Sequence, residues 1–227
     1  MAFLLQGYSA MTVLIFANGD VTEKEWLRPY LEKATTVIAV DGGVRHLLEL
    51  NHLPDVVIGD MDSLPPAARS RLEAAGARFI PHPAAKDQTD LELALLHAAA
   101  HTSDDMLLFG LLGSRLDQTL ANILLLTHPA LSGRRVQLLE QHQRAWVIET
   151  EGQITGAVGD TVSLIPLRGD VHVVSTTGLH WPLHNERLAF GLARGISNVM
   201  TAEVATVTIQ SGYLLCIHMD QGRVDEA

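Results

Sequence analysis

Acidic side chains cluster just after the apolar runs in the first half of the chain, where the strands of a sheet would end. The set comprises Asp41, Asp60, Asp62, Asp87, Asp90 and Asp117. Carboxylates that share one pocket repel each other unless a divalent cation neutralises them. Oxygen ligands of this kind suit Mg²⁺, which keeps several waters and bridges substrate phosphates. These positions therefore predict a Mg²⁺ site that also binds phosphate.

The glycine-containing loop 110–115 offers groups that bind phosphate. It follows the apolar run 106–109 and precedes a predicted helix, so its backbone N–H groups would lie at a helix N-terminus, beside the guanidinium of Arg115. No Gly-Lys-Ser/Thr sequence follows, which excludes a Walker A loop. Any one of these motifs is more simply explained as a helix cap or a turn. Their shared position after strands is what favours a ligand site.

The order of elements explains how these motifs would meet. In residues 11–141, short β-branched runs alternate with helical stretches, which predicts a Rossmann-like parallel sheet with helices on both faces. The predicted strands are 12–17, 36–40, 55–58, 78–80, 106–109 and 136–139, and the predicted helices are 22–33, 44–51, 65–75, 89–101 and 116–127. In such a sheet the loops at the carboxyl ends of the strands converge on one crevice, where ligands bind.

Residues 142–227 show strands without helices, separated by turn signals such as Ser211-Gly212. This pattern predicts a C-terminal all-β sandwich domain. The predicted strands are 145–149, 161–167, 171–176, 203–210 and 213–218.

The composition narrows the class of protein. The 16 basic and 26 acidic residues give a net charge of −10, which argues against nucleic acid or an anionic membrane as a partner. A hydrophobic content of 47% excludes global disorder, and a single cysteine excludes a disulfide framework. No apolar run approaches the ~20 residues needed to span a bilayer, and the start of the chain lacks the basic region of a signal peptide. We expect a cytoplasmic protein.

Seven short motifs, in this order and spacing, resemble those of the thiamine pyrophosphokinase (thiamine diphosphokinase) family. They are Asp41-Gly42-Gly43, residues 59–63 (Gly-Asp-Met-Asp-Ser), residues 87–90 (Asp-Gln-Thr-Asp), residues 113–118 (Gly-Ser-Arg-Leu-Asp-Gln), residues 159–164, residues 176–179 and residues 195–198. Ser114 stands where a second glycine is common in the family, and Gln118 replaces a frequent histidine. The resemblance covers nearly the whole chain from Met11 onward.

The resemblance implies an enzyme that transfers a pyrophosphoryl group from ATP to the hydroxyl of thiamine and releases AMP. It implies a homodimer with active sites between subunits. Carried over to this sequence, the Mg²⁺ ligands are Asp60, Asp62 and Asp90, and the ATP and phosphate residues are Asp41, Gly42, Gly43, Gly113, Ser114, Arg115, Asp117 and Gln118. The residues that meet thiamine are Ser197 and Asn198, and the catalytic residues are Asp87, Asp90 and Arg115, with either Asp87 or Asp90 accepting the hydroxyl proton.

Two other functions stay open on the sequence alone. A nucleotidyl- or glycosyltransferase would use Asp60-Met61-Asp62 as its metal site. A nucleotide- or thiamine-binding sensor would bind without turnover, although a sensor has no need of so many acidic residues.

Overall fold

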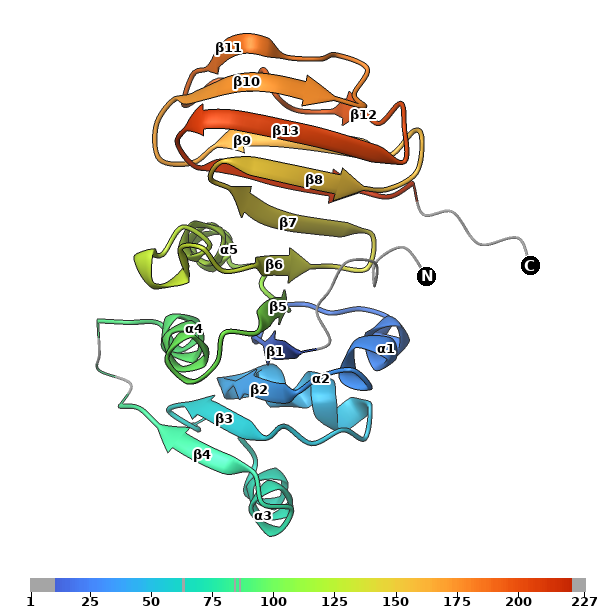
Figure 1. Ribbon diagram of the computed structural model, residues 1–227. Helices are drawn as coiled ribbons and strands as arrows, with labels where there is room; N and C mark the ends of the chain where they lie inside the picture. Colours follow the sequence, from blue (N-terminus) through green and yellow to red (C-terminus); the bar gives the residue numbers. More distant parts are fainter. Residues whose placement is uncertain (1–10, 63, 84, 86, 222–227) are drawn as a thin grey trace, which may run out of the picture. The chain divides into compact units, whose positions relative to one another are not determined.

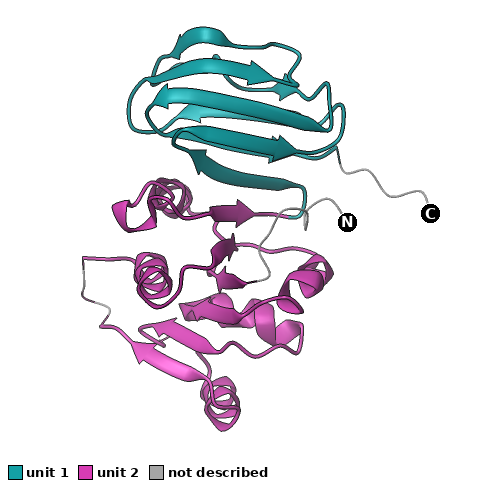
Figure 2. Cartoon of the chain, viewed as in Figure 1, with its two compact units in different colours: residues 1–6, 141–227 teal, residues 7–140 magenta. Residues whose placement is uncertain are grey.

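The computed structural model describes residues 11–62, 64–83, 85 and 87–221. These residues form two compact units, one ending at Glu140 and the other beginning at Gln141 (Figure 2). The sequence analysis expected a domain boundary after residue 141. Ser63 and Lys86, which lie in or beside two of the acidic motifs, are outside the described residues.

The unit that ends at Glu140 is a parallel sheet with helices on both faces. Its strands are β1 (Thr12–Phe16), β2 (Thr36–Val40), β3 (Val56–Gly59), β4 (Arg78–Pro81), β5 (Asp105–Phe109) and β6 (Val136–Leu139). Its helices are α1 (Arg28–Leu31), α2 (Val44–Glu49), α3 (Pro66–Ala74), α4 (Asp90–His101) and α5 (Leu116–Leu125), with 3₁₀ turns η2 (Lys24–Leu27), η3 (Asp41–Gly43) and η4 (Pro129–Leu131). Helices α4 and α5 lie on one face of the sheet and α1 on the other (Figure 1). The predicted α/β fold is therefore confirmed.

The strand order of this sheet is β6-β5-β1-β2-β3-β4, and every pairing in it is parallel. From β1 the chain moves outward to β4 and then returns to the other side of β1 as β5. The direction in which the chain adds strands to the sheet therefore reverses between β1 and β5. Ligands of open α/β sheets bind at such a switch point, beyond the carboxyl ends of the strands.

Central strand β1 is buried along its whole length, as the apolar run of a strand covered on both faces should be. Phe16 at its end stacks on Phe109 of β5, with ring centroids 4.8 Å apart. Trp26 and Tyr30 pack against the same Phe109 ring. This aromatic cluster supports the floor of the switch point.

The single helix predicted for 22–33 is wrong, because the structure has η2 followed by the short α1. Pro29 lies in the first turn of α1. It has no N–H group to continue a preceding helix, and its ring would clash with the carbonyl four residues earlier. The chain accordingly starts a new helix at this point.

The second unit consists of two antiparallel sheets, with strand orders β12-β9-β14-β7 and β11-β10-β13-β8. The strands are β7 (Gln143–Ile148), β8 (Glu151–Thr155), β9 (Thr161–Pro166), β10 (Val171–Thr177), β11 (His184–Leu188), β12 (Asn198–Val199), β13 (Val204–Ser211) and β14 (Leu214–Met219). One apolar core draws on both sheets, for example Leu164 and Cys216 from the first and Val173 and Val207 from the second. The predicted β-sandwich is confirmed.

The sequence missed β8, β11 and β12, and each of them is an outer strand in the orders given above. Outer strands have one unpaired edge and are often short or polar, which protects the edge from association. Strand β11 reads His-Asn-Glu-Arg-Leu, and β12 has only two residues. Such segments lack the apolar alternation that predicts a strand.

Cys216 lies on β14 and is fully buried in the core of this unit. Burial raises the pKa of its thiol far above the ordinary value. Across the described part of the chain, no helix has the length and apolar character needed to cross a membrane.

Candidate functional site

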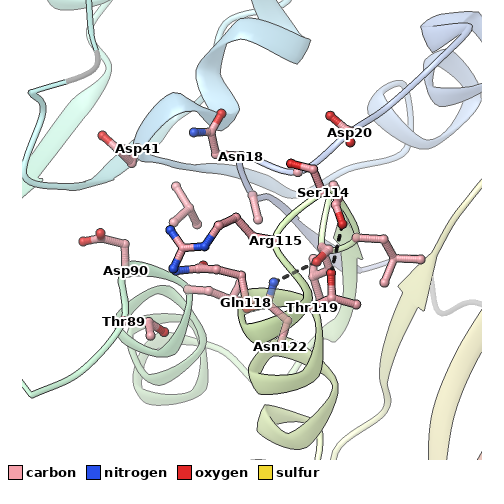
Figure 3. A pocket seen from close by; sticks show the side chains of 18 of the residues that line it. Asn18, Asp20, Asp41, Thr89, Asp90, Ser114, Arg115, Gln118, Thr119 and Asn122 are labelled. Atoms are coloured by element: carbon pink, nitrogen blue, oxygen red, sulfur yellow. Dashed lines mark hydrogen bonds between the residues drawn. The ribbon is translucent and has the colours of Figure 1, made fainter.

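A pocket of ≈ 450 Å³ lies at the switch point of the parallel sheet, where the loops after β1, β2 and β5 meet the first turns of α4 and α5 (Figure 3). Its polar lining comes from Asn18, Asp20, Asp41, Gln88, Thr89, Asp90, Ser114, Arg115, Gln118, Thr119 and Asn122. The pocket thus lies where the strand order predicts a ligand crevice.

Six of the residues expected in the site line this pocket, namely Asp41, Asp90, Gly113, Ser114, Arg115 and Gln118. They come from three separate stretches of the chain, so the fold brings chain-distant motifs together. Six other residues expected from the same unit do not line it, namely Gly42, Gly43, Asp60, Asp62, Asp87 and Asp117.

Gly42 and Gly43 pack the start of η3 against the end of β1. A Cβ on Gly42 would lie 2.5 Å from the side-chain oxygen of Asn18, and one on Gly43 would lie 2.1 Å from the carbonyl oxygen of Phe16. The contact at Gly43 is with backbone, so that position requires glycine, whereas a side chain at Gly42 would displace the amide of Asn18. Their close packing lets Asp41, the residue before them, reach the pocket wall.

Arg115 and Asp117 form a two-pronged ion pair at the start of α5. Nε of Arg115 donates to Oδ1 of Asp117 at 2.9 Å, and Nη2 donates to Oδ2 at 2.6 Å. The hydrogen bonds from Arg115 lower the pKa of the Asp117 carboxyl to about 2, with help from the backbone N–H of Gln118. Arg115 also occupies the N-cap position of α5, but its side chain makes no hydrogen bond to the N–H groups of the first turn. The first turn of α5 therefore has no side-chain cap from Arg115, although the Asp117 carboxyl accepts from the backbone N–H of Gln118.

Thr89 fixes the start of α4. Its Oγ1 accepts a hydrogen bond from the backbone N–H of Glu92 at 3.2 Å, which is the N-cap geometry expected before a helix. Asp90 consequently occupies the first turn of α4 and lies at the pocket wall opposite Ser114 (Figure 3).

The loop that carries Asp60 and Asp62 lies beside the pocket. The backbone N–H of Asp62 donates to Oδ1 of Asp60 at 3.1 Å, which folds the loop back on itself. Gly59, just before it, packs on Asp41, since a Cβ there would lie 3.0 Å from that of Asp41. Among the described residues, no group of three or more His, Cys, Asp or Glu side chains is arranged to hold a metal ion by itself.

Two polar residues of the pocket, Thr119 and Asn122, were not expected there from sequence. Asn18 and Asp20 follow the first strand, where polar motifs are predicted to meet at the crevice, and both line the pocket. Asn122 is buried on α5, and its Nδ2 donates to the carbonyl of Leu111 at 2.8 Å. A polar residue within the apolar stretch 120–125 was the signal for this tie between α5 and the loop after β5.

In the second unit, Asn198 and Ser197 differ in what their side chains touch. Oδ1 of Asn198 accepts from the backbone N–H groups of Trp181 at 3.0 Å and Val199 at 2.9 Å, and its Nδ2 donates to the carbonyl of Trp181 at 2.7 Å. Ser197 is exposed and has a left-handed backbone, with φ of 58°. The amide of Asn198 thus holds the Trp181 segment, and the hydroxyl of Ser197 is on the surface.

The fold and the pocket together define a two-unit protein, with an α/β unit suited to a phosphate-bearing ligand and a separate β-sandwich unit. Family comparison is more particular. The model described as "Thiamin pyrophosphokinase, catalytic domain" matches residues 27–138, and "Thiamin pyrophosphokinase, vitamin B1 binding domain" matches residues 147–214. The chain belongs to the thiamin pyrophosphokinase family.

Individual proteins agree with the family models. Thiamine pyrophosphokinase of Bacillus subtilis (strain 168) is 31% identical over 209 residues, which cover 91% of this chain and 97% of that protein. The crystal structure of thiamine pyrophosphokinase from Bacillus subtilis superposes with a TM-score of 0.81 at 30% identity and covers 92% of this chain and 99% of that one. The thiamin pyrophosphokinase structure from Geobacillus thermodenitrificans has a TM-score of 0.79 at 26% identity, and covers 93% and 98% of the two chains.

Proposed function

We propose that this chain is a thiamine pyrophosphokinase, which transfers the pyrophosphoryl group of ATP to the hydroxyl of thiamine. The observation that carries the proposal is the match of both units to the two domain models of one enzyme family. The thiamine hydroxyl oxygen attacks the β-phosphorus of ATP, and the bond from that phosphorus to the oxygen bridging to the α-phosphate breaks. AMP leaves, thiamine diphosphate forms, and the hydroxyl proton passes to a carboxylate.

The ATP phosphates are proposed to bind at the N-terminus of α5. The lining of the pocket by Gly113, Ser114 and Arg115 supports this placement. Backbone N–H groups and the positive end of the helix dipole favour an anion there, and a guanidinium binds phosphate oxygens in a forked geometry. Asp41 and Gln118 would then contact the nucleotide on either side. Asp117, which is bound to Arg115, would set the direction of the guanidinium.

The acidic residues beside the pocket fit Mg²⁺ through the chemistry of their donors. Mg²⁺ takes one or two protein carboxylates, keeps waters and uses substrate phosphates as further ligands, so a preformed cluster of three is not required. Asp90 lies at the pocket wall, and the loop of Asp60 and Asp62 lies next to Asp41. We propose Asp60, Asp62 and Asp90 as the ligands. When bound, the ion would neutralise phosphate charge.

Asp90 is favoured over Asp87 as the proton acceptor for the thiamine hydroxyl. Asp90 lines the pocket and Asp87 does not, and a general base must lie within hydrogen-bond reach of the proton it accepts. The remaining catalysis would be positioning and electrostatic stabilisation, as in phosphoryl transfer generally.

Thiamine is proposed to bind the second unit near Ser197. This residue lies within the segment matched by the vitamin B1 binding domain, and it is exposed, with a hydroxyl able to hydrogen-bond a ring nitrogen of a bound ligand. Asn198, in contrast, is proposed to support the site by holding the backbone of Trp181.

A homodimer is proposed on the basis of one exposed helix face. Leu116, Leu120 and Leu124 follow at four-residue intervals on α5, with 78%, 55% and 43% of their surfaces exposed. Residues at this spacing share one face of a helix, and a grouped apolar surface marks an interaction site. Replacing Leu120 and Leu124 together with glutamate should convert the dimer to a monomer in analytical ultracentrifugation.

A cytoplasmic location fits the proposed use of ATP.

The experiment that tests the proposed function is a coupled AMP-release assay on the purified protein. It compares ATP with thiamine, ATP alone, ATP with other hydroxyl compounds, and each mixture with Mg²⁺ or with a chelator. AMP release that requires both thiamine and Mg²⁺ supports the proposal. Tight binding of both substrates without AMP would indicate a sensor, and pyrophosphate release in place of AMP would indicate a nucleotidyltransferase.

A further inference from the structure

His46 is a buried histidine that contacts the pocket residue Gly19 but does not itself line the pocket. It belongs to α2 and is only 1% exposed. Its Nε2 lies 3.0 Å from the carbonyl oxygen of Gly19, in the loop after β1. The neighbouring Arg45 reaches the same loop, since its Nη2 donates to the carbonyl of Gly19 at 2.7 Å and to that of Asn18 at 3.0 Å.

The surroundings of the imidazole determine which of its two nitrogens carries a hydrogen. A carbonyl oxygen can only accept, so the short contact to Gly19 places the hydrogen on Nε2. Nδ1 of His46 is buried and has no hydrogen-bond partner in the described part of the chain. Burial, together with the charge of Arg45, lowers the pKa of His46 to about 4. The ring is therefore neutral at physiological pH, with Nδ1 unprotonated.

The carbonyl that His46 holds belongs to a peptide that joins two pocket loops. The backbone N–H of Gly19 donates to the carbonyl of Gly110, and that of Asp20 to the carbonyl of Leu112, both at 2.7 Å. A Cβ on Gly19 would lie 2.3 Å from each of these carbonyl oxygens, so the two loops are in the closest contact that a backbone permits. They come from β1 and β5, the strands that flank the switch point.

This contact decides where two side chains of the pocket point. Asn18 and Asp20 stand on either side of Gly19, and both line the pocket (Figure 3). A rotation of the peptide at Gly19 would turn both side chains and separate the loop after β1 from the phosphate loop. Two donors on the Gly19 carbonyl oppose that rotation, the exposed guanidinium of Arg45 and the buried ring of His46.

We propose that His46 is a positioning residue for the ATP pocket, whose neutral Nε2–H group holds the Gly19 carbonyl and so keeps Asn18, Asp20 and the phosphate loop in register. The inference rests on the proposed function only in naming ATP as the ligand. It assigns no contact between His46 and ATP.

Two substitutions at His46 separate a donor role from a packing role. His46→Leu replaces the imidazole with an apolar side chain of similar size and removes the donor, whereas His46→Gln keeps a donor at about the reach of Nε2. Loss of one such hydrogen bond should weaken ATP binding about tenfold in the leucine variant, measured by calorimetry, and the glutamine variant should stay within about twofold of wild type. The KM for thiamine should be unchanged in both. His101→Gln, at the exposed end of α4, is the matched control.

Two results for the His46 variants would overturn the inference. ATP binding that is the same in the leucine and glutamine variants would mean that His46 only fills space, as would equal rises in ATP and thiamine constants. If the leucine variant does not fold, His46→Asn replaces it, because its amide is too short to reach Gly19. Equal ATP affinity of the asparagine and glutamine variants would then refute the proposal.

Nitrogen-15 spectroscopy of the imidazole gives a test that needs no activity. The signal lost in His46→Gln should show a hydrogen on Nε2, none on Nδ1, and no protonation down to about pH 5. A hydrogen on Nδ1 would overturn the inference. The result is independent of the proposed function, which fails separately if the wild-type protein binds ATP and thiamine but releases no AMP.

Discussion

Asn198→Ala removes an amide that makes three hydrogen bonds inside the second unit. Asn198 is buried, so water cannot replace these bonds without opening the segment around Trp181. A hydrogen bond contributes about 1 kcal/mol net, and unpaired buried groups cost about 1–3 kcal/mol each. We therefore expect the free energy of unfolding of this unit to fall by about 3 kcal/mol.

Urea unfolding followed by tryptophan fluorescence measures this loss, because Trp146 and Trp181 both lie in the second unit. Hydrogen exchange measures it locally, since the backbone N–H of Trp181 should lose its protection while the N–H groups of β13 keep theirs. Asn198→Asp keeps acceptor oxygens for the N–H groups but buries an unpaired carboxylate against the Trp181 carbonyl, so its loss of stability at pH 7 should be at least as large and should shrink at low pH, where the protonated acid can donate. Ser197→Ala is the matched control on an exposed side chain and should change stability by less than about 0.5 kcal/mol.

The reasoning is refuted by one combination of results. If Asn198→Ala unfolds at the same urea concentration as wild type, yet its KM for thiamine rises more than about tenfold, the amide serves thiamine directly. The residue would then be a ligand contact, as the family resemblance implies, and the bonds to Trp181 would be incidental.

Three further predictions concern the first unit. Arg115→Lys should raise the KM for ATP by about tenfold or more and leave that for thiamine unchanged, because lysine cannot reproduce a forked contact; equal rises in steady-state kinetics would indicate a structural role. Asp62→Asn should fold normally and lower kcat by about 100-fold, the usual scale for losing a placed charge, so near-normal turnover would remove Asp62 from the metal site. Burial, with repulsion from Asp20, raises the pKa of Glu140 from 4.5 to about 7. Between these two pKa values, Glu140 keeps its proton in the folded protein and loses it in the unfolded protein. The free energy of unfolding therefore falls as the pH rises from 4.5 to about 7. Glu140→Gln should thus be more stable than wild type at pH 8, by about 1 kcal/mol after allowance for partial exposure, and an unchanged urea midpoint would contradict the assignment.

The sequence predicted where the pocket lies better than it predicted which residues line it. Apolar runs followed by polar motifs indicated parallel strands with a ligand site at their carboxyl ends, and the structure has a pocket there. Asp60 and Asp62 lie outside its wall because their strand, β3, is two strands away from β1. At a spacing of ~4.8 Å per strand, that is about 10 Å. Strand order in a sheet is set by packing between distant segments, and a linear pattern does not contain it.

The side-chain contacts that the sequence did not predict share a physical cause. The amides of Asn122 and Asn198 bind backbone groups of segments 11 and 17 residues away in the chain. An asparagine is equally common in turns and caps, so its type says little until the partner is known. His46 is similar, because its carbonyl partner lies 27 residues away.

The labelling rate of the single cysteine of the chain can report how often the second unit opens locally. Cys216 is fully buried, and burial disfavours its thiolate, the form that reacts with alkylating reagents. Labelling can therefore proceed only through transient opening of the sheet that holds β14. Its rate would report the frequency of that opening in the native protein, one event per molecule, without any engineered probe. Thiamine bound to this unit would slow the labelling in proportion to its occupancy.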